Sequence, residues 1–493
     1  FDEWAHVPCY TYASLKEDPN ICDFWGISLD KMWENLFDAS GGIGGAIWGY
    51  IDETFMLPDK AWEPSWIAFG KREDMGEPYT GSCIGYGEWG IVDVWRRQKP
   101  EFWGTKKAYS PVRLLTRRIT DFTDGERLLL TVRNRFDHTH LDEITVRYTY
   151  RGIEKTVKLA AIAPHQQGLL LIPGENWVEG EQLFVRFFTN RDELIDAYTV
   201  VLGREINAVS DKPSGTPLAI EETGEYVTVK GDGFEIPFLK STGLIADATS
   251  LGETVITKGP FLNLNVFQVN LPDADWEKTG FTYKKNNERV EITLSGVYRQ
   301  ITVEFLIHIS PDGQLQVDYL TSGEPRGLLR EAGVKFQLPE TIRRLKWKRE
   351  GYWSYYPEDS FAGHEGDISL YDSQQTAYRQ PPVQPWHLDT HNYYYWGNTG
   401  ACCGRPLTLQ AKGMKENCYR YVLATETGQG TLSVCSTDAS VACRINRNAQ
   451  EQLILYANNR WDYPEINCPQ EWGNYYKKLE SSPCFGRLTF YLR

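Results

Sequence analysis

A change of hydrophobic period near residue 112 is the feature that most limits how this chain can fold. Before it, helical and extended patterns alternate. After it, apolar residues recur at every second position in short runs that continue to Arg493, a pattern typical of strands with one buried face. The 493 residues are too many for one hydrophobic core, so we expect about three domains.

Residues 1–111 carry the alternation of a βα repeat. Asp18 is a plausible N-cap and Pro19 a first helical residue, and the apolar spacing that follows predicts a helix of about five turns. The glycine-rich segment 41–53 predicts a strand buried on both faces, and Pro100 opens a second helix. A parallel fragment this small needs neighbours for its faces and edges. It therefore predicts the C-terminal part of a (β/α)8 TIM barrel within a multidomain fold.

The rest of the chain is expected to be all-β. Residues 112–203 contain about six or seven short strands, a number and spacing typical of an immunoglobulin-like β-sandwich. Residues 204–218 are rich in Pro, Gly and Ser and predict a linker. Residues 219–493 hold strand patterns without helices and predict a large, two-layered β-sandwich.

Charge excludes two classes of partner. The net charge is −14, and the longest basic runs, 96–99 and 343–349, are short. Nucleic acid and anionic membrane surfaces both require a basic face. Because no run of ~18 apolar residues occurs, no membrane-spanning segment is expected either.

The cysteines do not follow a metal-binding pattern. The chain has ten, seven of them between Cys402 and Cys484, and none forms a C-x-x-C pair. Large cores do not need disulfides as small secreted domains do. We expect mostly reduced, packed cysteines, and a disulfide in the last region stays open.

Three residues indicate where chemistry could occur. In a βα barrel, functional side chains lie at the C-terminal ends of strands, and Glu3 and Trp48 would lie at two such ends. A carboxylate can attack or stabilise an anomeric carbon, while an indole stacks on a pyranose face. His6 could hydrogen-bond a sugar hydroxyl. On these residues alone, a solvated Glu, a core Trp and a loop-structuring His are the commoner interpretations.

Two motifs resemble the end of the catalytic barrel of glycoside hydrolase family 2, as found in large bacterial β-galactosidases. DEWAH (2–6) is followed about 40 residues later by GGAIWGYIDE (44–53). GEWGIVDVWRRQKPEFWGTKKAYSPV (87–112) resembles the family's exit from the barrel, and GPFLNLNVF (259–267) lies where the first long strands of its last domain begin. The resemblance extends over essentially the whole chain.

The resemblance implies a fold and a set of roles. Residues 219–493 would form a galactose-mutarotase-like β-supersandwich, as in the β-galactosidase small chain. Glu3 would be the catalytic nucleophile of a retaining enzyme that cleaves terminal β-D-galactosides. Trp48 would line the sugar pocket, and His6 would lie on the same loop as Glu3. Trp472, in QEWGNYY, would stack on the aglycone sugar, although GNYY departs from the family's residues.

The departures from the family concern the other half of the catalytic pair. The family's acid/base Glu follows an Asn on an earlier barrel strand, and its Mg²⁺ ligands lie near it; no matching segment occurs in this sequence. The chain is therefore expected to hold no cofactor, to be inactive alone, and to require the N-terminal half of the same enzyme. Mg²⁺ and a homo-oligomer would belong to the complete enzyme. The alternatives are another family 2 β-glycosidase, such as a β-glucuronidase, or a noncatalytic carbohydrate-binding or assembly subunit; the compartment is unknown.

Overall fold

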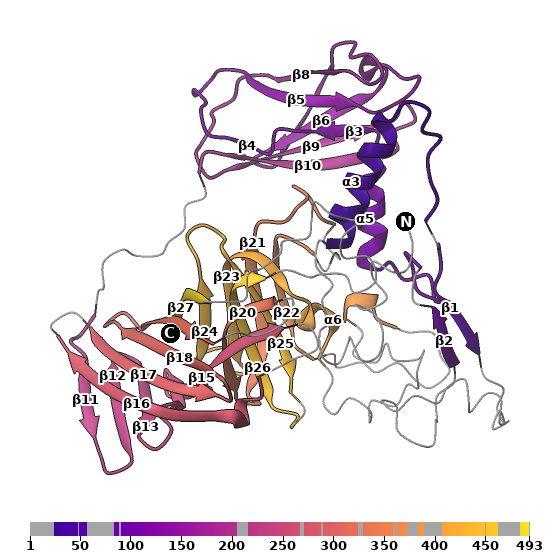
Figure 1. Cartoon of the computed structure of the whole chain (residues 1–493). Coiled ribbons are helices and arrows are strands. Elements are labelled where there is room, and N and C mark those ends of the chain that lie inside the picture. Colours follow the sequence, from indigo (N-terminus) through magenta and orange to yellow (C-terminus); the bar gives the residue numbers. More distant parts are fainter. Residues whose placement is uncertain are drawn as a thin grey trace, which may run out of the picture.

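The computed structural model is mostly β, with helices near its N-terminal end (Figure 1). The structure describes residues 24–47, 49–56, 83–87, 90–204, 215–266, 271–286, 289–323, 329–357, 360, 362–371, 383–388, 407–448, 450–461 and 484–492.

Two helices form the N-terminal part. Helix α3 (Phe24–Asp38) contains the apolar spacing from which a helix was predicted, while its predicted start at Asp18 lies outside the described residues. Helix α5 (Pro100–Ala108) begins with proline in the first turn, as expected. The two helices approach closely where glycines face each other. A Cβ placed on Gly26 of α3 would lie only 3.4 Å from the Gly104 Cα of α5.

The apolar run that follows the four glycines differs from the predicted buried strand. Its described residues 46, 47, 49 and 50 form no strand, and Tyr50 is 61% exposed. Regular pairing in this part instead joins β1 (Glu53–Met56) and β2 (Cys83–Gly87), which are antiparallel. An apolar run becomes a buried parallel strand only when both of its edges are paired. Among the described residues before α5, parallel pairing is limited to one bridge, Ile51 with Val92.

The described residues before 111 therefore do not make up a TIM barrel. They supply α3, α5, one antiparallel strand pair and one parallel bridge. Much of the predicted barrel fragment lies outside the described residues. The all-β part of the fold prediction is confirmed, and the barrel stays a prediction.

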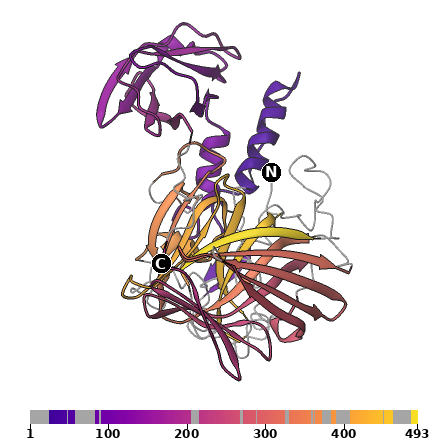
Figure 2. The same ribbon diagram turned by 90° about the vertical axis from the view of Figure 1, so that its left-hand side faces the viewer.

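A small β-sandwich follows α5. One sheet has the order β4-β10-β9-β6-β7 and the other the order β3-β5-β8. Their strands are β3 (Val112–Leu114), β4 (Arg118–Ile119), β5 (Leu128–Asn134), β6 (Thr145–Tyr150), β7 (Ile153–Val157), β8 (Gln167–Ile172), β9 (Gln182–Phe188) and β10 (Leu194–Leu202). Alternate residues of β5 and β6 are buried, which is the period-two pattern of the sequence. Figure 2 shows this sandwich standing apart from the larger β unit.

The remaining described strands form one 17-stranded curled sheet that packs on itself. They are β11 (Ala219–Glu222), β12 (Tyr226–Gly231), β13 (Phe234–Leu239), β14 (Ile245–Ser250), β15 (Glu253–Val266), β16 (Trp276–Lys285), β17 (Val290–Tyr298), β18 (Ile301–Ile309), β19 (Gln314–Ser322), β20 (Leu329–Leu338), β21 (Ile342–Arg349), β22 (Glu365–Ser369), β23 (Lys415–Thr425), β24 (Thr431–Cys435), β25 (Val441–Arg447), β26 (Leu453–Trp461) and β27 (Phe485–Leu492). The short helix α6 (Leu409–Lys412) was not predicted.

The sheet closes through pairings between strands far apart in sequence. β15 pairs with β20, β20 with β26, and β19 with the C-terminal β27, all antiparallel. Large apolar side chains from these strands fill the space enclosed, including the fully buried Phe336 of β20 and Phe490 of β27. The dominant hydrophobic core of the protein is therefore in this unit.

A buried polar cluster joins four neighbouring strands of the large sheet. Arg444 of β25 donates to both carboxylate oxygens of Glu331 on β20, at 2.7 and 2.9 Å. Asn263 of β15 donates to Glu331 at 3.0 Å and to Asn458 of β26 at 2.8 Å. All four side chains are at most 4% exposed, and the Arg444 guanidinium lies 3.7 Å from the centre of the Tyr456 ring. The cluster favours a single register because any slip would leave a buried charge without its partner.

Helix α3 faces the small sandwich through an acidic stripe. Asp30, Glu34 and Asp38 are spaced by one helical turn and so lie on one face. Asp30 pairs with Arg113, while Glu34 and Asp38 both accept from Arg133, at 2.9 and 2.6 Å. These contacts orient the helix against the sandwich.

The cysteines in the described part of the large sheet are reduced. Cys418, Cys435 and Cys443 carry free thiols, and Cys418 and Cys443 are buried. Burial raises the pKa of the Cys435 thiol to about 11. For these three residues the expectation of packed, reduced cysteines is confirmed.

Candidate functional site

The four residues predicted to form the sugar site cannot be placed relative to one another. Glu3, His6, Trp48 and Trp472 all lie outside the described residues. The structure does describe the backbone on both sides of Trp48. It also describes the segment that pairs with the residues after Trp48.

The segment after Trp48 runs parallel to a second segment that begins at Gly90. Amide groups of Ile91 and Val92 donate to the carbonyls of Gly49 and Tyr50, at 3.3 and 3.0 Å. The amide of Asp52 donates in turn to the carbonyl of Val92, at 3.1 Å. This pairing is the one parallel contact among the described elements before α5, and it includes parts of two of the motifs singled out in the sequence.

A buried ion pair locks the two segments together. Lys99 Nζ lies 2.8 Å from Asp52 Oδ1, and both side chains are 1% exposed. The Gly90 amide also donates to Asp52 Oδ1, at 2.7 Å. A second buried carboxylate, Asp93, accepts from the Arg97 side chain at 2.6 Å. Both carboxylates are engaged by basic side chains, so their described role is to hold the backbone next to Trp48.

Sequence reasoning did not single out Asp52, Asp93 or Lys99. Asp52 is the second-last residue of the glycine-rich motif, and Lys99 stands directly before the proline that opens α5. A carboxylate next to an apolar run and a lysine next to a helix start are both common on surfaces, so the signal was too weak to identify a buried pair.

The position of Gly90 gives a direct test of this arrangement. A Cβ built there would lie 2.2 Å from the Asp52 amide nitrogen and 2.6 Å from the Val92 carbonyl oxygen. We expect Gly90→Ala to separate the segments and to raise amide exchange in peptides covering 49–52 and 90–99 by about tenfold or more, since the clash is with backbone. Gly224→Ala is the matched control, because its Cβ would meet nothing within 4 Å. Unchanged exchange in Gly90→Ala would contradict the pairing.

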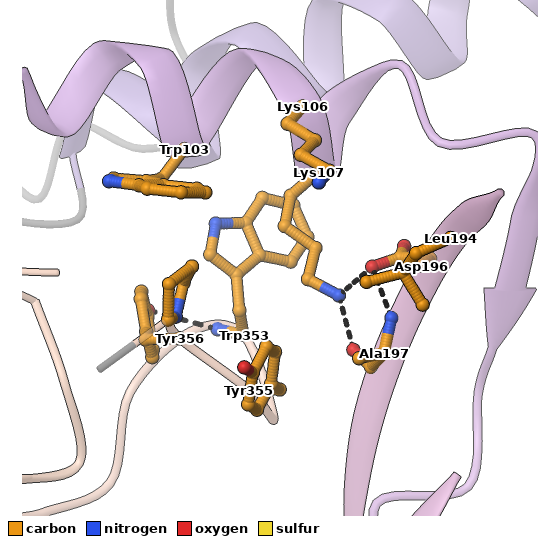
Figure 3. Close-up of a pocket in the computed structure, with 10 residues that line it drawn as sticks. Trp103, Lys106, Lys107, Leu194, Asp196, Ala197, Trp353, Tyr355 and Tyr356 are labelled. Atoms are coloured by element: carbon orange, nitrogen blue, oxygen red, sulfur yellow. Dashed lines mark hydrogen bonds and ion pairs between the residues drawn. The ribbon is translucent and has the colours of Figure 1, made fainter. Parts of the chain in front are cut away.

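An aromatic pocket lies where α5, the small sandwich and the loop after β21 meet. It holds about 380 Å³ of space, part of it open to solvent. Figure 3 shows Trp103 projecting from α5 on one side, and Trp353, Tyr355 and Tyr356 rising from the loop on the other. The remaining lining residues are Lys106, Lys107, Leu194, Asp196, Ala197 and Pro357.

One wall of the pocket is a group of polar residues that bond to one another, which we call the polar anchor: Lys107, Asp196, Ala197 and Tyr198. The Lys107 ammonium pairs with Asp196 and donates to the Ala197 carbonyl at 2.6 Å, as the dashed lines of Figure 3 mark. The Tyr198 hydroxyl lies 2.7 Å from the other Asp196 oxygen. Burial lowers the pKa of Lys107 while Asp196 opposes the shift, and burial raises the pKa of Tyr198 well above its usual value. The anchor therefore adds little net charge to the pocket.

The aromatic wall of the pocket, Trp353, Tyr355 and Tyr356, is held in place by hydrogen bonds and by ring packing. The Trp353 amide donates to the Tyr356 hydroxyl at 3.1 Å, and the Trp353 carbonyl lies 2.7 Å from His364 Nε2. The Tyr355 ring packs on Phe184 of β9, with ring centres 5.0 Å apart. The pocket is thus formed before any ligand arrives. It was not predicted from the sequence, because its walls come from positions about 250 residues apart.

The described residues contain no grouping of three His, Cys, Asp or Glu side chains suited to hold a metal ion. Within the same described part, every helix is too short or too polar to cross a membrane.

Comparisons with known proteins add likenesses of low similarity. No protein-family model and no curated protein matches the chain. Similar solved structures include a putative aldose 1-epimerase from Escherichia coli K12, with 13% identity, a TM-score of 0.30 and coverage of 56% of this chain and 99% of that chain. A galactose 1-epimerase from Lactobacillus acidophilus NCFM has 12% identity, a TM-score of 0.21 and coverage of 57% and 98%. A β-D-mannosidase from Dictyoglomus thermophilum has 15% identity, a TM-score of 0.15 and coverage of 36% and 19%. At TM-scores this low, function has to be argued from this chain's own residues.

Proposed function

We propose that this chain is the C-terminal part of a retaining glycoside hydrolase that cleaves terminal β-D-galactosides. Glu3 is the nucleophile, Trp48 and His6 contact the sugar, and Trp472 stacks on the aglycone. The acid/base Glu belongs to an N-terminal half that this sequence does not include.

The reaction proceeds in two balanced steps. The Glu3 carboxylate forms a bond to the anomeric carbon while the bond to the leaving oxygen breaks, and the acid/base Glu gives that oxygen its proton. Water then attacks the glycosyl-enzyme, loses a proton to the same acid/base group, and releases Glu3. Glu3 must be ionised at the start, so donors close to it are required.

One observation carries the proposal. The segment directly after Trp48 is paired in parallel with 91–93 and locked there by the buried Asp52–Lys99 ion pair. Parallel neighbours whose ends converge are what a barrel mouth requires of these two motifs. The all-β units that follow agree with the domain order that the motifs imply.

Galactose follows from the domain order, above all from the long terminal β unit. Another family 2 β-glycosidase, such as a β-glucuronidase, would use Glu3 in the same way and differ only in the sugar accepted. A noncatalytic carbohydrate-binding or assembly subunit would need no nucleophile at all.

Covalent labelling separates these candidates. The complete enzyme, with both halves present, is treated with a 2-deoxy-2-fluoro-β-galactosyl donor that has an activated leaving group. The fluorine slows hydrolysis of the glycosyl-enzyme, so the label should accumulate on the peptide that contains Glu3. Excess galactose should suppress labelling, and the corresponding glucuronyl donor should not label. Labelling of a different carboxylate would refute the assignment of Glu3, and no labelling by any glycosyl donor would favour the noncatalytic subunit.

A further inference from the structure

We propose that the aromatic pocket between α5, β10 and the 353–357 loop binds one neutral pyranose ring of an oligosaccharide. The described lining contains none of the four proposed catalytic-site residues. The inference goes beyond the proposed hydrolysis and does not require it.

The shape of the pocket suits a flat ring. Trp103 lies on one side, and Tyr355 and Tyr356 lie on the other (Figure 3). All three are half-buried, so part of each ring is accessible. Part of the space of about 380 Å³ is open to solvent, so a ring held between these side chains would keep one edge exposed. The C–H faces of a pyranose pack well on such aromatic surfaces.

The charges of the pocket favour an uncharged ligand. The Lys107 ammonium is already bound to Asp196 and to the Ala197 carbonyl, so it has little left to offer an anion. Asp196 in turn also contacts the Tyr198 hydroxyl and the Ala197 amide, at 2.7 and 2.8 Å. A phosphate or carboxylate buried here would lack a counter-charge. Burial of a neutral ring would not carry the free-energy cost of an unpaired charge.

The mouth of the pocket favours a sugar over a simple aromatic ring. Lys106 is exposed at the rim, 6.0 Å from the Trp103 ring centre, and Leu194 beside it is 44% exposed. Ring hydroxyls that point outward could hydrogen-bond the Lys106 ammonium and water. The open side also leaves room for the next residue of an oligosaccharide, whereas a wholly apolar ring would be better served by a closed cavity.

The walls are organised in advance, which lowers the entropic cost of binding. Phe184 supports Tyr355, and the Arg349 guanidinium lies 5.5 Å from the centre of the Tyr356 ring. The loop is also tied to α3, because the Tyr352 hydroxyl donates to Asp30 at 3.0 Å.

The test is binding of β-1,4-galactotriose, followed by calorimetry and by ligand-observed NMR. All proteins carry Trp48→Ala and Trp472→Ala, so that the proposed catalytic site does not contribute. We expect Trp103→Ala and Tyr355→Ala each to weaken binding about tenfold, which is 1.4 kcal/mol, and Trp103→Phe to retain most of it. Tyr226→Ala, a half-buried tyrosine far from the pocket in sequence, is the matched control. Circular dichroism checks that each variant is folded.

Each outcome is decisive. Equal binding by Trp103→Ala and the parent, no binding of the trisaccharide by the parent, or binding of phenol and indole but not of the trisaccharide would each overturn the inference. Failure of Glu3 labelling together with Trp103-dependent trisaccharide binding would overturn the proposed hydrolase and leave this site standing. Labelling of Glu3 without Trp103-dependent binding would support the proposed hydrolase and overturn the aromatic pocket as a sugar site.

Discussion

Glu3→Gln in the complete enzyme is expected to lower kcat for an aryl β-galactoside by about a thousandfold or more. Gln keeps the size of Glu but cannot form the glycosyl-enzyme, and loss of a nucleophile removes the covalent route as a whole. Steady-state kinetics at saturating substrate measure the effect. Glu126→Gln, at an exposed position on the small sandwich, is the control and should leave kcat unchanged.

A second variant distinguishes a nucleophile from an acid/base. In Glu3→Ala, added azide can enter the vacated space and attack the anomeric carbon, so the product should be the α-galactosyl azide. An acid/base would instead yield the β-azide. Unaltered hydrolysis in Glu3→Gln, or a β-azide from Glu3→Ala, would remove Glu3 from the role proposed for it.

Breaking the buried cluster of the large sheet should have the largest effect on stability. Glu331→Gln leaves the Arg444 guanidinium, in a residue only 2% exposed, without its counter-charge, and the expected loss is about 3–5 kcal/mol. Urea titration with amide exchange read on β20 and β25 peptides isolates this unit from the rest of the chain. The pair Glu331→Leu with Arg444→Met should recover most of the loss, because it removes both charges together.

An exposed pair of the same kind is the matched control. Arg344 and Asp367 also form two hydrogen bonds across neighbouring strands, but their side chains are 57% and 38% exposed. Asp367→Asn should therefore cost less than about 1 kcal/mol. Equal losses for Glu331→Gln and Asp367→Asn would show that burial does not set the strength of the Glu331 pair.

Local patterns predicted helices α3 and α5 and most of the strands, but not the short helix α6. Apolar residues at helical spacing run through α3, and Pro100 marks the start of α5. Runs such as VEITLSGVY became β17 with strictly alternating burial. The exception is the apolar run after Gly45, where the sequence predicted a strand but the described residues of the run are paired in parallel only near Ile51. A strand depends on its neighbours as well as on its own residues.

The sequence by itself determined that this chain is mostly β, that α5 begins at Pro100, and that alternate side chains of strands such as β17 are buried, because these follow from the spacing of nearby residues. Only the tertiary structure decided that Lys99 reaches Asp52, that Arg444 reaches Glu331, and that Trp103 meets Tyr355 across a pocket. Those contacts join residues 47 to 252 positions apart. No local period encodes such pairs; they arise when sheets close and helices dock, since a buried charge or ring is stable only where the folded chain supplies its partner.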